Sequence, residues 1–173
     1  MNTKRKEELM NQFLSTLDQD ARTVYQEIST CLSELGYHPQ KERSNLTFKC
    51  DMHHKQIAKK GIKNNQAHDP FFALRFSACS NYSLKFADVV RDAIEKSPSK
   101  TPRCPSDCNF CGGDADTHIY SFTFPDGARK SHCGAYALEI PNIAADDIQE
   151  IKNLIHQEHE YLLAHESHQV REE

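Results

Sequence analysis

Residues 71–79 read FFALRFSAC and carry the clearest strand pattern in the chain. Phe72, Leu74 and Phe76 alternate with other residues, which is the period of a β-strand that turns one face toward a core. Arg75 falls on the opposite, polar face of such a strand. We therefore expect a half-buried strand here, and the elements that cover its apolar face must come from the sequence on either side.

Two further strands precede this one, at residues 45–50 and 56–63, and a helix follows it at residues 82–97. The helix has apolar residues at three- and four-residue steps, and it is followed by Pro98, which cannot continue a helix. The sequence therefore predicts three strands and then a helix.

Residues 4–35 predict one long helix or two helices joined at a bend, because apolar side chains recur every three or four residues. Asp18 or Asp20 could begin the second segment, since an aspartate oxygen accepts the free N–H groups of a first helical turn. Gly36 is expected to end the helix, because glycine adopts the left-handed cap conformation without steric strain.

The second half of the chain repeats the order strand, strand, strand, helix. The predicted elements are strands at residues 118–124, 128–133 and 136–140 and a helix at about residues 143–165. This order predicts an α+β two-layer sandwich, an antiparallel sheet with helices on one face, and a possible βββα pseudo-repeat. Residues 1–97 and 98–173 would be its halves within one compact domain, with a metal-binding loop inserted between them.

The composition is typical of a folded intracellular domain. Hydrophobic residues make up 38% of the 173 residues and charged residues 27%, and one core suffices to fold a chain of this length. No apolar run approaches the ~20 residues that span a bilayer, and the N-terminus lacks the apolar segment of a secretory signal. We expect a cytoplasmic location and no membrane partner. In a reducing compartment, seven cysteines indicate metal or redox chemistry rather than disulfides.

Three of the cysteines lie within eight residues, in the stretch CPSDCNFCGG. They are Cys104, Cys108 and Cys111. The prolines and glycines around them disfavour helix and strand, so the sulfurs of such a loop can converge on one point. Zinc takes four ligands in a tetrahedron and accepts cysteine sulfur readily. The loop therefore predicts a Zn²⁺ site that needs one more ligand from elsewhere in the chain.

The fourth ligand is expected from the hairpin that follows the loop. Cys133 ends a strand that the Pro-Asp-Gly turn at residues 125–127 would fold back toward the loop, and a glycine follows it, as one follows Cys111. His132 and His118 are the alternatives. His132 and Cys133 are neighbours that point to opposite faces of a strand, so only one of the two can bind the metal.

The residues CPSDCNFC also resemble the C-x3-C-x-aromatic-C motif of the radical SAM enzymes, with Phe110 in the aromatic place. The resemblance implies a four-iron cluster on the three cysteines and S-adenosylmethionine at the open iron. The partial barrel of that family needs several strand-helix units after the motif, each about 30 residues long. One hairpin, one strand and one helix are predicted after Cys111, which is fewer elements than that barrel needs. Zinc is therefore the favoured metal, and an iron-sulfur cluster is the alternative.

Two other stretches are rich in histidine. The C-terminal helix places His156, His159 and Glu160 on neighbouring turns, where they could bind a surface metal, although the acidic residues around them favour a solvated polar face. Residues 50–54, CDMHH, put a thiol beside two imidazoles, as a cysteine nucleophile requires. Neighbours along a strand end need not touch, so we assign no catalytic residue.

Basic residues are densest between residues 41 and 63, although the net charge of the chain is −4. The basic members of this stretch are Lys41, Arg43, Lys49, Lys55, Lys59, Lys60 and Lys63. Only two acidic residues, Glu42 and Asp51, lie among them. Such a stretch can attract phosphates, but lysines also protect the edge of a sheet from pairing with another chain.

These features predict a non-catalytic ligand-binding, partner-binding or regulatory protein with a structural zinc site made of four cysteines. The reason is that four protein ligands leave a metal ion no open position for a substrate. Its partner would be a small molecule or another protein. The alternatives are nucleic-acid binding through the zinc loop and the basic 41–63 stretch, and an iron-sulfur enzyme.

Overall fold

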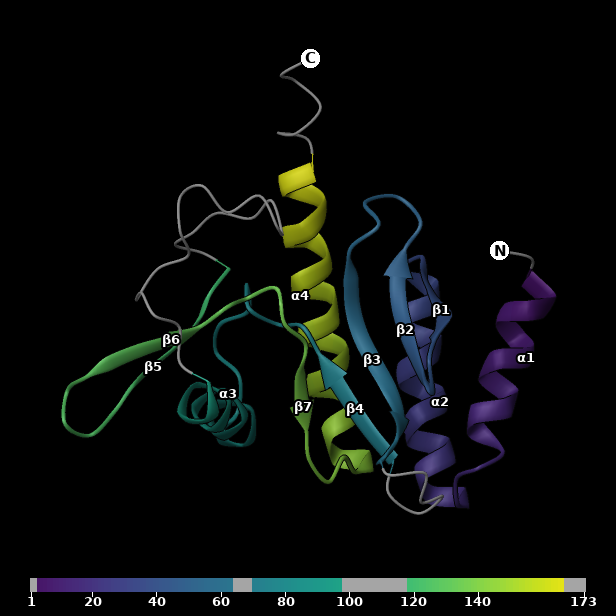
Figure 1. Cartoon of the computed structure of the whole chain (residues 1–173), viewed down its shortest axis with the longest axis horizontal. Coiled ribbons are helices and arrows are strands. Elements are labelled where there is room, and N and C mark those ends of the chain that lie inside the picture. The colour runs from purple at the N-terminus through teal and green to yellow at the C-terminus, as the bar shows by residue number, and fades with distance from the viewer. Residues whose placement is uncertain (1–2, 64–69, 98–117, 167–173) are drawn as a thin grey trace.

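The computed structural model describes residues 3–63, 70–97 and 118–166, which form helices packed on an antiparallel sheet (Figure 1). The elements are α1 (Thr3–Leu14), α2 (Gln19–Glu34), β1 (Tyr37–Glu42), β2 (Asn45–Cys50), β3 (Gln56–Ile62), β4 (Pro70–Leu74), α3 (Leu84–Lys96), β5 (Tyr120–Thr123), β6 (Arg129–His132), β7 (Leu138–Ile140), a 3-10 turn (Ala145–Asp147) and α4 (Ile148–Glu166). The α+β class expected from the sequence is confirmed. Among these residues no helix is both long enough and apolar enough to cross a membrane.

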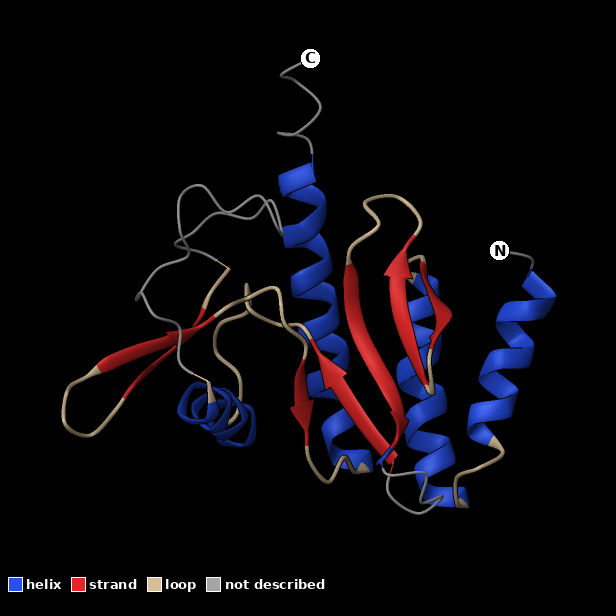
Figure 2. Cartoon of the chain, in the orientation of Figure 1, coloured by secondary structure: helices blue, strands red, loops and turns tan. Residues whose placement is uncertain are grey.

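The main sheet has five strands in the order β1-β2-β3-β4-β7, and every neighbouring pair is antiparallel. Among the described strands, β5 and β6 pair only with each other, and they form a separate ribbon that extends away from the sheet (Figure 2). The expectation of one sheet made from all the strands is therefore wrong. Because only β7 of the second set joins the main sheet, the structure does not show the βββα pseudo-repeat.

Two strands differ from their predictions. Strand β4 ends at Leu74, so residues 75–79 continue outside the sheet. Strand β1 was not predicted, because Pro39 and charged residues interrupt the pattern. Pro39 is tolerated there because β1 is the edge strand of the sheet in the described part of the chain, where it pairs only with β2.

The bend expected in the N-terminal helix is present and separates α1 from α2. Asp18 begins α2, and its Oδ1 accepts a hydrogen bond from the Ala21 N–H at 2.8 Å. Arg22 reaches back and donates to the carbonyls of Leu14 at 3.1 Å and Leu17 at 3.0 Å, which satisfies groups at the end of α1. Gly36, with φ +81°, follows the end of α2 as predicted.

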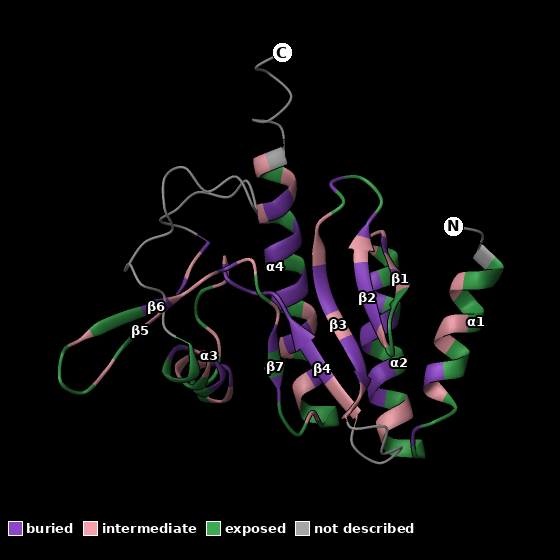
Figure 3. Ribbon diagram, viewed as in Figure 1, coloured by how far each residue is buried: buried purple, intermediate pink, exposed green. Residues whose placement is uncertain are grey.

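The sheet has one face against helices, and no helix of the described residues covers its other face. Helices α2 and α4 lie behind the strands in Figure 1, and no described helix lies in front of them. Phe48, Ala58 and Leu74 form one row across β2, β3 and β4 and are fully buried. Figure 3 shows buried residues along these three strands. Alternate residues of the same strands point to the opposite face. Any ligand that binds to the sheet therefore meets that second face.

An aromatic cluster joins the separate ribbon and α3 to the edge of the main sheet. The ring of Phe76 lies 5.8 Å from that of Phe86 in α3 and 5.2 Å from that of Tyr120 in β5, measured between centroids. The Tyr120 hydroxyl accepts a hydrogen bond from the Phe76 N–H and donates one to the Tyr136 carbonyl, both at 3.0 Å. Residues from before and after the 98–117 segment thus share one hydrophobic core.

Candidate functional site

The predicted metal site lies only partly within the described residues. Cys104, Cys108 and Cys111 fall in the 98–117 segment, outside them. Cys133 directly follows β6 and carries a free, partly buried thiol. Within residues 3–63, 70–97 and 118–166 no three His, Cys, Asp or Glu side chains are grouped closely enough to hold a metal ion. The four-cysteine site and the inserted loop therefore stay predictions.

Both ends of the 98–117 segment lie beside Cys133. Before the segment, the Ser97 carbonyl is 2.7 Å from His132 Nδ1, which donates a hydrogen bond to it. After the segment, the His118 carbonyl packs so closely on Gly134 that a Cβ at residue 134 would lie 1.4 Å from its oxygen. The two neighbours of Cys133 in the chain thus each hold one end of the segment.

The chain length on each side is sufficient for the three thiols to reach Cys133. Cys104 is seven residues beyond Ser97, and Cys111 is seven residues before His118. Seven residues span at most about 25 Å when fully extended. The geometry of the described ends therefore permits the predicted set of four sulfurs.

The two alternative histidine ligands are held by other groups. The Nδ1–H of His132 donates a hydrogen bond to the Ser97 carbonyl, and the His132 ring lies 5.4 Å from that of Tyr136, measured between centroids. His118 is completely buried, with its ring stacked on Tyr161 at 6.4 Å. These contacts favour Cys133, whose thiol is partly accessible, as the fourth ligand.

Sequence reasoning missed a buried ion pair between Arg75 and Glu158. Arg75 was expected on a polar strand face, but its side chain is 3% exposed and that of Glu158 is fully buried. Arg75 Nε lies 2.6 Å from Glu158 Oε1, and the Ala78 N–H donates to Oε2 at 2.9 Å. Burial raises the pKa of Glu158, while Arg75 and the Ala78 N–H act in the opposite direction.

Spacing alone could have located Glu158. Ile151, Leu154, Ile155 and Leu162 are buried on one stripe of α4, and Glu158 occupies the position on this stripe between Ile155 and Leu162. The expectation of a solvated polar face on α4 is therefore wrong at this residue.

His159 is also buried, and it belongs to a second polar cluster. The Tyr37 hydroxyl lies 3.1 Å from His159 Nδ1 and 3.2 Å from His53 Nε2. The other His53 ring nitrogen accepts a hydrogen bond from the Lys55 N–H at 3.2 Å. Both nitrogens of His53 are thus engaged away from the thiol of Cys50, which argues against a Cys-His nucleophile here. Burial lowers the pKa of His159.

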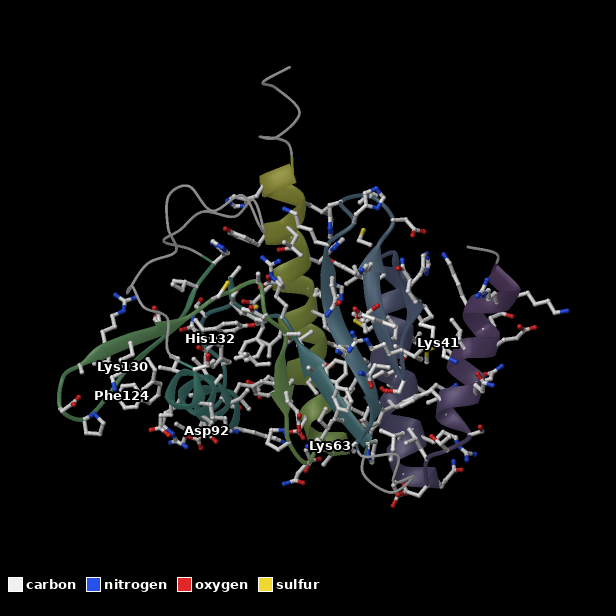
Figure 4. The ribbon with its side chains drawn as sticks, viewed as in Figure 1. Lys41, Lys63, Asp92, Phe124, Lys130 and His132 are labelled. Carbon is white, nitrogen blue, oxygen red and sulfur yellow. The ribbon has the colours of Figure 1, made fainter. Side chains whose placement is uncertain are left out.

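The basic 41–63 stretch divides into separate environments. Lys60 is buried and donates to the Ser29 hydroxyl at 2.6 Å, and its burial lowers the pKa of the amine to about 7. Lys63 forms an ion pair with Glu139 at the lower end of the sheet in Figure 4, while Lys41 projects near the β1 edge. The continuous basic patch suggested by the sequence does not form.

A smaller basic pocket forms instead between the β2–β3 turn, strand β3 and the loop that precedes β7. Its volume is about 480 Å³, within the range of small-molecule sites. The lining residues are Lys49, His54, Lys55, Gln56, Lys59, Arg75, Ala135, Tyr136 and Ala137. Neither aspartate nor glutamate is among these described residues, so the pocket favours an anion.

Comparison of the chain with family models, with curated proteins and with solved structures finds no match. The function is therefore inferred from the residues of this chain alone. Two features stand out by their chemistry. One is the approach of both ends of the cysteine-rich segment to Cys133, and the other is the basic pocket.

Proposed function

We propose that the protein is a non-catalytic ligand- or partner-binding protein, stabilised by one zinc ion on Cys104, Cys108, Cys111 and Cys133. The single observation that supports this is the position of Ser97 and His118 at the two neighbours of Cys133. It brings both ends of the cysteine-rich segment to the one cysteine that sequence reasoning chose from the hairpin.

The donor set fits a structural role for zinc. Thiolate sulfur binds zinc at about 2.3 Å, and a tetrahedral set of four protein ligands leaves no position for water or substrate. The ion would then act as a crosslink between the 98–117 segment and the end of β6. Because the four ligands would meet only in the folded chain, metal binding would contribute directly to folding.

The crosslink would also support the basic pocket. The Cys133 carbonyl accepts a hydrogen bond from the Tyr136 N–H at 3.3 Å, and Tyr136 and its neighbours line the pocket. The loop between β6 and β7 therefore connects the proposed metal ligand to the proposed binding surface. Loss of zinc is expected to loosen the pocket as well as to lower stability.

Elemental analysis of protein purified without added metal tests the proposal. We expect one zinc per chain in the native protein and in Cys79→Ser, and a loss of most of the zinc in Cys133→Ser. Cys79 is the matched control, because it is also partly buried and its thiol donates to the Leu154 carbonyl at 3.4 Å, a bond that serine can replace. A chelator should lower the melting temperature of the native protein.

Three results would contradict the proposal. The first is full zinc content in Cys133→Ser. The second is a native protein that holds no metal and whose melting temperature does not respond to the chelator. The third is iron with labile sulfide, which would favour the iron-sulfur enzyme instead.

A further inference from the structure

Two lysines project from neighbouring strands toward the basic pocket. Lys60 points into the helix-covered side of β3, where it contacts Ser29 of α2. Lys59 must then point to the other face, because successive strand residues alternate. Lys49 follows buried Phe48 in β2 and lies on that same face by the same rule. The face of the sheet that no described helix covers thus presents two amines to one pocket.

The charge of these amines is not balanced within the described residues. Lys49 and Lys59 form no ion pair with any residue in the described ranges, and both side chains are partly buried. His54 and Lys55 add further nitrogen at the rim of the pocket. Both amines line the same pocket, and a bound anion would balance their positive charge.

Arg75 adds a guanidinium to the same pocket. Its Nε lies within ion-pair distance of Glu158, yet both Nε and Nη2 are buried and have no hydrogen-bond partner in the described part of the chain. Buried donors without a partner are rare and cost free energy. An oxyanion that accepts a hydrogen bond from Nη2 would satisfy it, and guanidinium groups suit phosphate oxygens particularly well.

Tyr136 supplies an aromatic surface at the edge of the pocket. It is 59% exposed, the most exposed aromatic residue in the described chain, and it lines the pocket beside the basic groups. The backbone of Tyr136 is fixed by the Cys133 carbonyl and the Tyr120 hydroxyl, so the ring is presented from a restrained loop. Exposed aromatic rings beside basic groups stack the flat rings of nucleotide ligands.

We infer that this pocket binds a small phosphorylated ligand with an aromatic ring, of the nucleotide class. The phosphate oxygens contact Lys49, Lys59 and Arg75, and the ring of the ligand stacks on Tyr136. A volume of about 480 Å³ suits one such molecule. The inference names the ligand of the binding role proposed above and rests on that role, but it does not require that the metal be zinc.

Calorimetric titration of the full, metal-replete chain with pyrophosphate, ADP and adenosine tests the inference. ADP is expected to bind about tenfold more tightly than pyrophosphate, because stacking adds to the phosphate contacts. Adenosine without phosphate should show no measurable binding. The affinity for ADP and for pyrophosphate should fall as the salt concentration rises, since the phosphate groups of both ligands form ionic contacts with the protein.

Substitutions separate the two parts of the site. Lys49→Ala and Lys59→Ala should each weaken ADP and pyrophosphate about tenfold, whereas Tyr136→Ala should weaken ADP alone. Lys41→Ala is the matched control, because Lys41 is exposed at the β1 edge, away from the pocket (Figure 4). Thermal melting followed by circular dichroism establishes that each variant is folded.

The inference is overturned if neither phosphate compound binds at low salt, if Tyr136→Ala leaves ADP binding unchanged, or if Lys41→Ala weakens binding as much as Lys59→Ala. Tighter binding of a short single-stranded RNA than of ADP, weakened by Lys41→Ala, would also overturn it in favour of a nucleic-acid surface. The metal measurement is separate from these titrations, so the failure of one proposal can be told from the failure of the other.

Discussion

Lys59 and Lys60 are neighbours in β3, yet the fold gives them opposite environments. Lys60 lies in the core, within 4.7 Å of the centre of the Phe13 ring and 5.1 Å of that of Phe48. Lys59 faces the basic pocket beside Lys49. A run of lysines in a sequence is therefore not a patch of charge, because strand alternation divides it between the two faces of a sheet.

The two buried cations, Lys60 and Arg75, show how the chemistry of the side chain determines its partner. Arginine cannot lose its proton in a protein, so burial of Arg75 requires the negative charge of Glu158. A lysine amine can become neutral instead, and Lys60 contacts a hydroxyl and two aromatic rings. Its pKa falls to about 7 because burial disfavours the charged form.

The largest effect is expected from Glu158→Gln, which removes the charge that compensates Arg75. An unpaired buried guanidinium should reduce the free energy of unfolding by about 3–5 kcal/mol. Urea denaturation measures the loss. Glu160→Gln is the control, because Glu160 is exposed on the same helix and its replacement should change stability by less than about 0.5 kcal/mol. Equal losses of unfolding free energy in the two variants would show that the buried Glu158 carboxylate contributes no more to stability than an exposed one.

Local sequence patterns predicted much of the fold because local chemistry fixes those parts. Asp18 begins α2 through its own hydrogen bond to the next turn, and Gly36 follows α2 through its own backbone freedom. The paired strands β2 and β3 lie close to their predicted ranges. These features depend on residues that are near one another in the chain.

The missed features depend on contacts between distant residues. Arg75 and Glu158 come from a strand end and a C-terminal helix, and each looks like a surface charge until the other is placed beside it. Strands β5 and β6 have the alternating apolar residues of core strands, but it is β7 that pairs with β4 at the edge of the main sheet. The basic pocket likewise combines residues 49–59 with residues 135–137, which no local pattern connects.

A smaller effect, with a pH dependence, is expected from Lys60→Met. Below pH 7 the native protein buries a charged amine, so methionine should raise the free energy of unfolding by about 2–3 kcal/mol at pH 6. Above pH 7 the native lysine loses its proton while the unfolded lysine keeps it up to about pH 10.5. The unfolded state then binds more protons, and the stability of the native protein rises with pH by up to about 1.4 kcal/mol per unit.

The advantage of Lys60→Met should therefore shrink by about 1–2 kcal/mol between pH 6 and pH 8.5. Urea denaturation gives the free energy of unfolding of the native protein and of Lys60→Met at the two pH values. Subtracting one protein's value from the other's at each pH cancels the effect of all other titrating groups, because the two proteins share them. An advantage that is constant over this range would mean that Lys60 keeps its proton in the core, stabilised by the Ser29 hydroxyl and the two rings.

The smallest effect is expected from Lys59→Met, which makes the same chemical change one residue earlier in β3. Lys59 is only partly buried, on the face that no described helix covers, so its replacement removes no charge from the core and should change the free energy of unfolding by less than about 0.5 kcal/mol at both pH 6 and pH 8.5. Comparison of Lys59→Met with Lys60→Met therefore shows how much of the change in the free energy of unfolding depends on which face of the sheet carries the lysine, because the chemical change is the same in both. If Lys59→Met stabilised the protein as much as Lys60→Met does at pH 6, repulsion among the pocket amines would be as costly as burial of a lysine in the core. In that case added pyrophosphate should reduce the gain, because the bound anion would stabilise the native protein more than the variant, which binds it more weakly.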